Sequence, residues 1–177
     1  MEDQLKFPIG TFQRPEIITK QQIDAYIHVI ETFPERLAAT ASQLTAKQLD
    51  TPYRPGGWTI RQVIHHCADS HMNSFARFKL SLTEDSPVIK PYYEDRWAEL
   101  ADAKELPIEP SLFLLKGLHI RWVVLLKSLQ PKDLKRTFVH PQNGRTFTLD
   151  ENIGLYAWHC NHHLAHITML KEKQGWS

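Results

Sequence analysis

The stretch ENIGLYAWHCNHHLAHITMLKEK, residues 151–173, joins a helical apolar pattern to four histidines within eight residues. Its apolar residues recur at steps of three and four, which is typical of a helix with one face in a core. They are Ile153, Tyr156, Ala157, Cys160, Leu164 and Ile167. We expect an N-cap at Asp150 and an end near Gly175, where glycine accommodates a left-handed backbone. This segment predicts the last helix of a helical domain.

Three earlier segments show the same helical spacing: residues 21–44, 59–82 and about 111–129. The first is expected to start near Thr19 or Lys20. Pro34 lies inside it and lacks an amide hydrogen, which predicts a kink or a break, with the helix continuing beyond. Thr59 is the expected N-cap of the second helix, because its hydroxyl can accept a hydrogen bond from a free amide of the first turn.

The connections between these helices differ in kind. Four prolines break the pattern over residues 83–110, a length that lets the chain cross the end of a bundle. Within it, residues 95–100, DRWAEL, predict a short helix. Asn143-Gly144 stands between two runs of β-branched and aromatic residues, which predicts a small hairpin. The sequence therefore predicts an all-α four-helix bundle, with a β-hairpin between helices three and four, in a single domain over residues 1–177.

Composition excludes several classes of function. The chain has 21 Lys and Arg against 20 Asp and Glu, so no excess charge favours nucleic acid or a membrane surface. Its apolar stretches are far shorter than the ~20 residues that a membrane helix needs. Two cysteines, Cys67 and Cys160, are too few for a disulfide scaffold, and the N-terminus lacks a secretory pattern. We therefore expect a cytoplasmic protein.

The ten histidines are the compositional feature that points to chemistry. On the last helix, His159 and His163 lie one turn apart and closer to the apolar arc than the outward pair His162 and His166. Two imidazoles at i and i+4 can share one cation, which leaves a third ligand to another element. The sequence favours the inner pair as ligands. The alternative that these histidines have no ligand role stays open at this point.

The third ligand is expected on the second helix, from His65 or His66. Periodicity does not separate them, but His66 shares its stripe with Val63, Ser70 and Asn73, a less solvent-like set than that of His65. A zinc-protease HExxH motif is excluded, because Cys160 stands where the glutamate would be. Each cysteine follows a favoured histidine and so points about 100° away from it. We interpret both cysteines as buried small hydrophobes.

Three motifs resemble those of the DinB-like family: WTIRQVIHH at 58–66, ADSHMN at 68–73 and LYxWHxxHHxAHI at 155–167. The match is best to its YfiT-type members, which are described as metal-dependent hydrolases and are related to bacillithiol S-transferases. The likeness extends from the Pro-Ile-Gly that begins at Pro8 to the terminal Gly175-Trp176-Ser177. It implies a bundle in up, down, down, up order. It also implies one divalent metal, nickel or zinc, held by His66, His159 and His163.

Three protein ligands leave a coordination position open, as in catalytic metal sites. A divalent ion lowers the pKa of water and polarises a substrate oxygen, so we predict a metal-dependent hydrolase. The alternatives are a metal-dependent thiol (bacillithiol) S-transferase acting on electrophiles, a non-catalytic metal-binding stress protein, and a helical interaction module.

No catalytic base stands out in the sequence. Ser70, Asn73 and His162 are candidates for orienting the ligands or the substrate. We expect a small-molecule substrate, and keep a low-molecular-weight thiol and a homodimer as open predictions.

Overall fold

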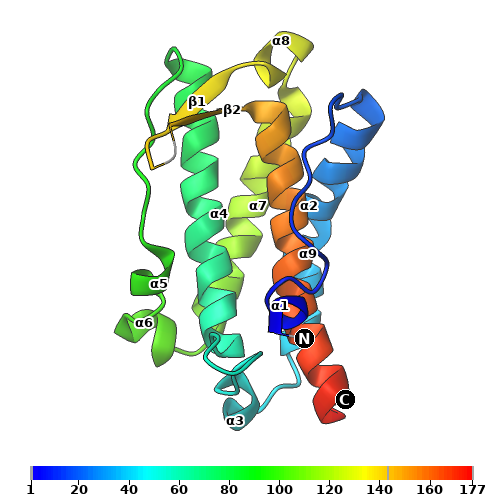
Figure 1. The fold of residues 1–177 in the computed structure, drawn as a ribbon, viewed down its shortest axis with the longest axis vertical. Coiled ribbons are helices and arrows are strands. Elements are labelled where there is room, and N and C mark those ends of the chain that lie inside the picture. The colour runs from blue at the N-terminus through cyan, green and yellow to red at the C-terminus, as the bar shows by residue number, and fades with distance from the viewer. Residues whose placement is uncertain (1, 143, 177) are drawn as a thin grey trace.

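Four long helices packed side by side form the body of the molecule (Figure 1). The computed structural model describes residues 2–142 and 144–176. The long helices are α2 (Lys20–Ala41), α4 (Ile60–Thr83), α7 (Glu109–Ser128) and α9 (Leu149–Gln174). In the described part of the chain, five short helices lie in the segments between and before them: α1 (Glu2–Lys6), α3 (Ala46–Leu49), α5 (Glu94–Trp97), α6 (Ala101–Lys104) and α8 (Pro131–Leu134). The predicted all-α four-helix bundle is confirmed.

The order of the helices follows from the long connection after α4. Residues 84–108 return along the outside of α4 to the end of the bundle where that helix began, so α7 runs parallel to α4 (Figure 1). α2 and α9 run in the opposite direction. Both α2 and α4 pack against α7 and against α9. This is the up, down, down, up order, and it places α4 beside α9.

Local sequence signals account for the helix starts in the first half of the chain. Thr19, Thr45 and Thr59 each accept a hydrogen bond from the backbone amide three residues on, and the side-chain oxygen of the glutamine there accepts one from the backbone amide of the threonine. Such capping boxes satisfy amides that the first helical turn leaves free. The predicted start of the first helix near Thr19 or Lys20 and the predicted N-cap Thr59 are confirmed.

The predicted cap of the last helix is wrong. α9 starts at Leu149, directly after the second strand, so Thr148 occupies the N-cap position. Asp150 instead lies in the first turn, where its carboxylate accepts hydrogen bonds from Thr148 and from the amide of Glu151 and pairs with Lys135. The predicted end is correct, because Gly175 adopts the left-handed conformation with φ +65°.

α2 continues through Pro34 without interruption. A proline inside a helix leaves the carbonyl four residues earlier without its usual amide donor, and here that carbonyl belongs to Ile30. The Ile30 oxygen instead lies 2.6 Å from Nδ1 of His119 on α7. A contact between helices thus replaces the missing bond within α2.

The predicted hairpin is confirmed. β1 (Thr137–His140) and β2 (Arg145–Thr148) pair antiparallel, with Thr137 opposite Thr148. In the predicted Asn143-Gly144 turn, Asn143 lies outside the described residues, while Gly144 has φ +61°. The hairpin lies at the end of the bundle where α9 begins (Figure 1).

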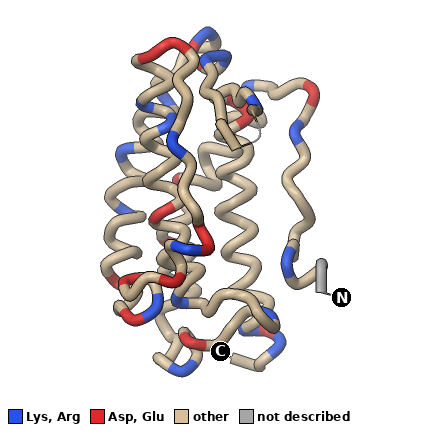
Figure 2. Tube along the Cα trace, turned by 60° about the vertical axis from the view of Figure 1, so that its left-hand side comes forward, with Lys and Arg blue, Asp and Glu red and all other residues tan. Residues whose placement is uncertain are grey.

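The core lies between the four long helices. Trp122, Phe33 and Phe78 are among its largest fully buried side chains, and burying such a side chain contributes roughly 1.5–3 kcal/mol. Cys67 and Cys160 are fully buried in the same cluster, as predicted. Figure 2 shows basic and acidic residues interspersed along the outer turns and connections. Over the described residues, no helix is both long and apolar enough to cross a bilayer.

Candidate metal centre

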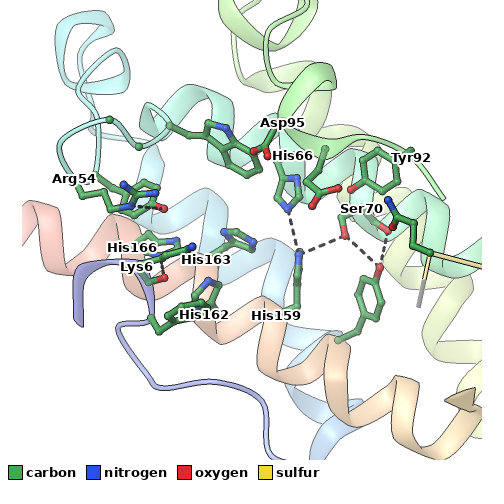
Figure 3. A pocket seen from close by; sticks show the side chains of 18 of the residues that line it. Lys6, Arg54, His66, Ser70, Tyr92, Asp95, His159, His162, His163 and His166 are labelled. Atoms are coloured by element: carbon green, nitrogen blue, oxygen red, sulfur yellow. Dashed lines mark hydrogen bonds between the residues drawn. The ribbon is translucent and has the colours of Figure 1, made fainter. Parts of the chain in front are cut away.

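Three histidines from two helices converge where α4 packs against α9. His66 comes from α4, and His159 and His163 lie one turn apart on α9. One ring nitrogen from each lies within 4.8 Å of the others, and the Nε2 atoms of His66 and His159 are 3.3 Å apart. In Figure 3 the three rings face a common space. We refer to them below as the histidine trio.

The spacing of the trio fits a divalent cation. Two imidazole nitrogens bound to one tetrahedral zinc ion at about 2.1 Å lie roughly 3.4 Å apart. The observed 3.3 Å between His66 and His159 matches this spacing. Neutral imidazole is a common ligand of zinc and nickel. The residues present therefore suit the kind of ion that the histidine pattern predicts.

Burial keeps the trio neutral. Burial, together with the smaller effect of the positive charges that His162 and His166 would carry, lowers the pKa of His66 to about 3. Burial likewise holds the pKa values of His159 and His163 well below the ordinary range of histidine. A neutral imidazole has a free lone pair, which is what a metal requires. Near pH 7 no proton has to be removed from a charged ring before an ion binds.

A cavity of about 600 Å³ opens above the trio. The Trp58 ring packs against His66, with ring centroids 4.6 Å apart. Ser70 Oγ lies 3.4 Å from Nε2 of His159 and 3.2 Å from the Tyr156 hydroxyl. Tyr92 also lines the cavity, and burial raises the pKa of its phenol. Charged residues of both signs also line the cavity: Lys6, Arg54, Arg77, Glu94 and Asp95.

The N-terminal segment covers the outer pair of histidines on α9. Phe7 packs against His162 at 6.0 Å between ring centroids, and Nε2 of His166 donates to the Lys6 carbonyl at 3.1 Å. As a result His162 and His166 are only 7% and 4% exposed. The expectation that this pair faces outward is wrong, because residues far away in the sequence bury it. Both rings still line the cavity.

His162, His163 and His166 form a second group whose ring nitrogens lie within 4.8 Å. It shares His163 with the trio, so two ions bound together would lie close to each other. At ~5 Å and an effective dielectric constant of ~20, two divalent ions repel by roughly 13 kcal/mol. Neither group contains a carboxylate that could offset this repulsion. The arrangement therefore suits one ion at a time.

The other predicted residues divide into two sets. Ser70 and His162 line the cavity, whereas Asn73 does not and donates its amide to the Asp69 carbonyl within α4. His65 points away from the trio and lies 2.7 Å from Ser111 Oγ and 3.2 Å from the Leu106 carbonyl oxygen. The structure thus brings His66, and not its neighbour, to the pair on α9.

Two buried histidines near the trio were not predicted. His71 Nε2 lies 3.0 Å from Nδ1 of His159, and His71 Nδ1 lies 2.8 Å from Nε2 of His119. His119 occupies the buried stripe of α7 that also contains Leu115, Trp122 and Leu126. A polar residue on such a stripe is a signal that the sequence contains. It does not reveal the partner, which comes from another helix.

The bundle and the trio together define a class of helical proteins with a candidate metal site between their second and fourth long helices. The model of the DinB superfamily matches residues 30–167. This chain belongs to the DinB superfamily.

Known relatives match nearly the whole chain. A protein of Bacillus mycoides (strain KBAB4), named "putative metal-dependent hydrolase", is 56% identical over 172 residues, covering 97% of this chain and 98% of the relative. A protein of the same name from Bacillus thuringiensis subsp. konkukian (strain 97-27) is 55% identical with the same coverage. The solved structure of YfiT from Bacillus subtilis, described as "a probable metal-dependent hydrolase with an unusual four-helix bundle topology", has a TM-score of 0.96. It is 51% identical and covers 98% of this chain and 99% of its own.

Proposed function

We propose that this chain is a metal-dependent hydrolase that holds one divalent ion, zinc or nickel, through His66, His159 and His163. The observation that carries the proposal is the 3.3 Å separation of two Nε2 atoms beside a third histidine at a cavity. The names of the relatives support the same class of activity. The cavity of about 600 Å³ suits a small molecule as substrate.

When bound, such an ion lowers the pKa of a water molecule and polarises a substrate oxygen. The chain itself supplies hydrogen-bond donors beside it. Ser70 and Tyr156 form a hydroxyl pair next to His159. Tyr92 keeps its phenolic proton, because burial raises its pKa, and it can donate to a substrate oxygen. The rings of Trp58 and Phe7 pack against His66 and His162 and limit the access of bulk water to the metal site and these hydroxyl groups.

The first experiment measures metal content. Protein purified without an affinity tag is expected to contain, or to take up, one Zn²⁺ or Ni²⁺ per chain, and a His66→Ala variant is expected to lose it. His65→Ala is the matched control, because His65 is the neighbouring residue on α4 and bonds outside the trio. A folded wild-type protein that binds neither ion would contradict the proposal.

The second experiment measures turnover on a panel of esters and amides. Hydrolysis that depends on the added ion and is lost in His66→Ala supports the proposal. Ion binding without turnover on this panel or on thiols would favour the predicted metal-binding stress protein.

The predicted thiol transfer is tested in the same preparation. The metal-loaded protein is incubated with monochlorobimane and a low-molecular-weight thiol. If conjugation requires both the thiol and the ion, and none of the esters and amides is hydrolysed, thiol transfer and not hydrolysis is the function.

A further inference from the structure

A chain of hydrogen bonds runs from the trio through the core to the backbone of α2. Nδ1 of His159 lies 3.0 Å from Nε2 of His71, and Nδ1 of His71 lies 2.8 Å from Nε2 of His119. Nδ1 of His119 lies 2.6 Å from the Ile30 carbonyl oxygen. His71 and His119 are 0% and 1% exposed, so this chain of contacts, called the histidine relay below, excludes water along most of its length.

The carbonyl at the end of the relay sets its direction. A carbonyl oxygen only accepts hydrogen bonds, so Nδ1 of His119 must carry the proton. Pro34 makes this carbonyl available, because it lies four residues after Ile30 and has no amide hydrogen to donate to it. The proline in the middle of α2 thus has a structural counterpart in His119 on α7.

The direction of hydrogen-bond donation is the same at each ring of the relay, because the buried rings are neutral. Among the described residues no carboxylate is bonded to a relay nitrogen, and a buried cation without a counter-charge is costly. A neutral imidazole with a proton on Nδ1 has a lone pair on Nε2. His119 Nε2 therefore accepts from His71 Nδ1, and His71 Nε2 accepts from His159 Nδ1. The last lone pair in the series is on Nε2 of His159.

We propose that His71 and His119 are positioning residues that hold His159 as its Nδ1–H tautomer and so present the Nε2 lone pair to the metal site before any ion arrives. This inference rests on the proposed function. Both groups that face this nitrogen can donate hydrogen to it: Nε2 of His66 at 3.3 Å and Ser70 Oγ at 3.4 Å. His159 is the one member of the trio for which a described side chain accepts from Nδ1.

The relay affects ion binding through the tautomer equilibrium. An unrestrained neutral imidazole exchanges its proton between Nδ1 and Nε2, and an Nε2–H ring cannot bind an ion through that atom. Partners that hold the remote N–H of a ligand histidine typically change metal affinity by about 10–100-fold. His71 touches the ligand directly, whereas His119 acts through His71. We expect the larger loss on removal of His71.

The direct test is the tautomer state of the metal-free wild-type protein. In protein labelled with ¹⁵N at histidine, long-range ¹H–¹⁵N correlation spectra distinguish a protonated ring nitrogen from a bare one. His71, His119 and His159 are each expected to show one protonated Nδ1 and one bare Nε2. An Nε2–H or averaged pattern at His159 would overturn the proposal, and this measurement needs no variant to fold.

Variants separate positioning from packing. His119→Phe keeps a ring but removes the acceptor, so the His159 pattern is expected to become averaged and the Kd for Zn²⁺ to rise about 10-fold. His119→Gln is expected to restore both, because its amide can accept from His71 and donate to Ile30. Trp122→Phe is the control, since Trp122 packs against both relay rings and its indole N–H has no partner among the described residues. It is expected to leave both readouts unchanged.

Two further outcomes distinguish this inference from the proposed function. If Zn²⁺ binds at the trio and His159 is not held as the Nδ1–H tautomer, the relay has no positioning role and the proposed function stands. If the tautomers are as expected but neither Zn²⁺ nor Ni²⁺ binds, the proposed function fails, and the positioning role toward an ion fails with it.

Discussion

Two groups of buried histidines in this molecule are alike in exposure and opposite in bonding. His71 and His119 use both ring nitrogens in hydrogen bonds inside the core. His162, His163 and His166, called the cavity histidines below, each leave a buried Nδ1 without a partner among the described residues. In the first group every ring nitrogen has a hydrogen-bond partner within the protein. In the second group each Nδ1 could gain a partner only from outside the described residues.

This difference shows which histidines are available to a ligand. A buried polar atom without a partner costs about 1–3 kcal/mol, and native structures rarely leave one without a reason. The relay histidines gain nothing from an ion, whereas those at the cavity lie where an ion or a water molecule could reach. His159 connects the two groups, because its Nδ1 belongs to the relay and its Nε2 faces the cavity.

The largest expected effect is the stabilisation of the wild-type protein by an added ion. At a free concentration about 1,000-fold above the Kd, Zn²⁺ stabilises the folded state by about 4 kcal/mol, or ~8–16 °C in Tm for a chain of this size. Scanning calorimetry with and without the ion measures the shift. The same shift in His66→Ala would show that the ion binds elsewhere.

The next effect separates the trio from the second histidine group. His159 belongs only to the trio and His166 only to the second group. Loss of a direct ligand is expected to weaken binding by at least the ~100-fold seen for outer partners, so His159→Ala should raise the Kd for Zn²⁺ by that factor or more. His166→Ala should change it by less than about threefold. Competition with a chromophoric chelator measures both Kd values. A larger loss of affinity in His166→Ala than in His159→Ala would show that the ion binds at the second group.

Local patterns predicted the parts of this site that lie within one helix. The i,i+4 spacing of His159 and His163 and the apolar arc of α9 suffice to bring that pair together, and Thr59 marks the start of α4. Periodicity left His65 and His66 unresolved. The structure separates them by tertiary contact, since the Leu106 carbonyl and Ser111 bond to His65 outside the cavity.

The features that the sequence did not reveal depend on residues distant in the chain. The pair His162 and His166, which was predicted to face outward, is buried because Phe7 and the Lys6 carbonyl fold over it. The five-residue helix α1 and the turn after it are too short to show a periodicity that would indicate their docking surface. The relay needs His119 to meet a carbonyl on α2. Pro34 indicated a disturbed helix, but not that another helix would supply the missing donor.

A smaller effect is expected at the cysteines, which adjoin two trio members in sequence but face the core. Cys67 and Cys160 are fully buried, and burial raises the pKa of both thiols. Cys67→Ser should lower the free energy of unfolding by about 1–3 kcal/mol, because it places a hydroxyl in an apolar site. Its Kd for Zn²⁺ should match that of the wild type. Urea denaturation and metal titration measure the two quantities, and a weakened ion affinity would make Cys67 part of the metal site.

The smallest effect concerns the pH dependence of the relay. Burial lowers the pKa of His119 to about 4, from an ordinary value near 6.5. The unfolded chain therefore takes up a proton at this residue as the pH falls below 6.5, while the folded chain does so only near pH 4. Stability from this residue is complete above pH 6.5 and is lost as the pH falls toward 4. At pH 5 the loss is on the order of 1–2 kcal/mol.

His119→Gln removes the titrating group and should flatten the fall in unfolding free energy between pH 7 and pH 5, measured by urea denaturation of the metal-free protein. His71, Phe33 and Trp122 pack against His119 from α4, α2 and α7, and of these only His71 titrates. His71 remains in the variant, so the difference between the two slopes reports His119. Equal slopes for wild type and His119→Gln would mean that His119 is charged in the folded protein at pH 5. A charged His119 carries a proton on both ring nitrogens, so its Nε2 could not accept from His71 and the hydrogen bonds of the relay would not all run in one direction at that pH.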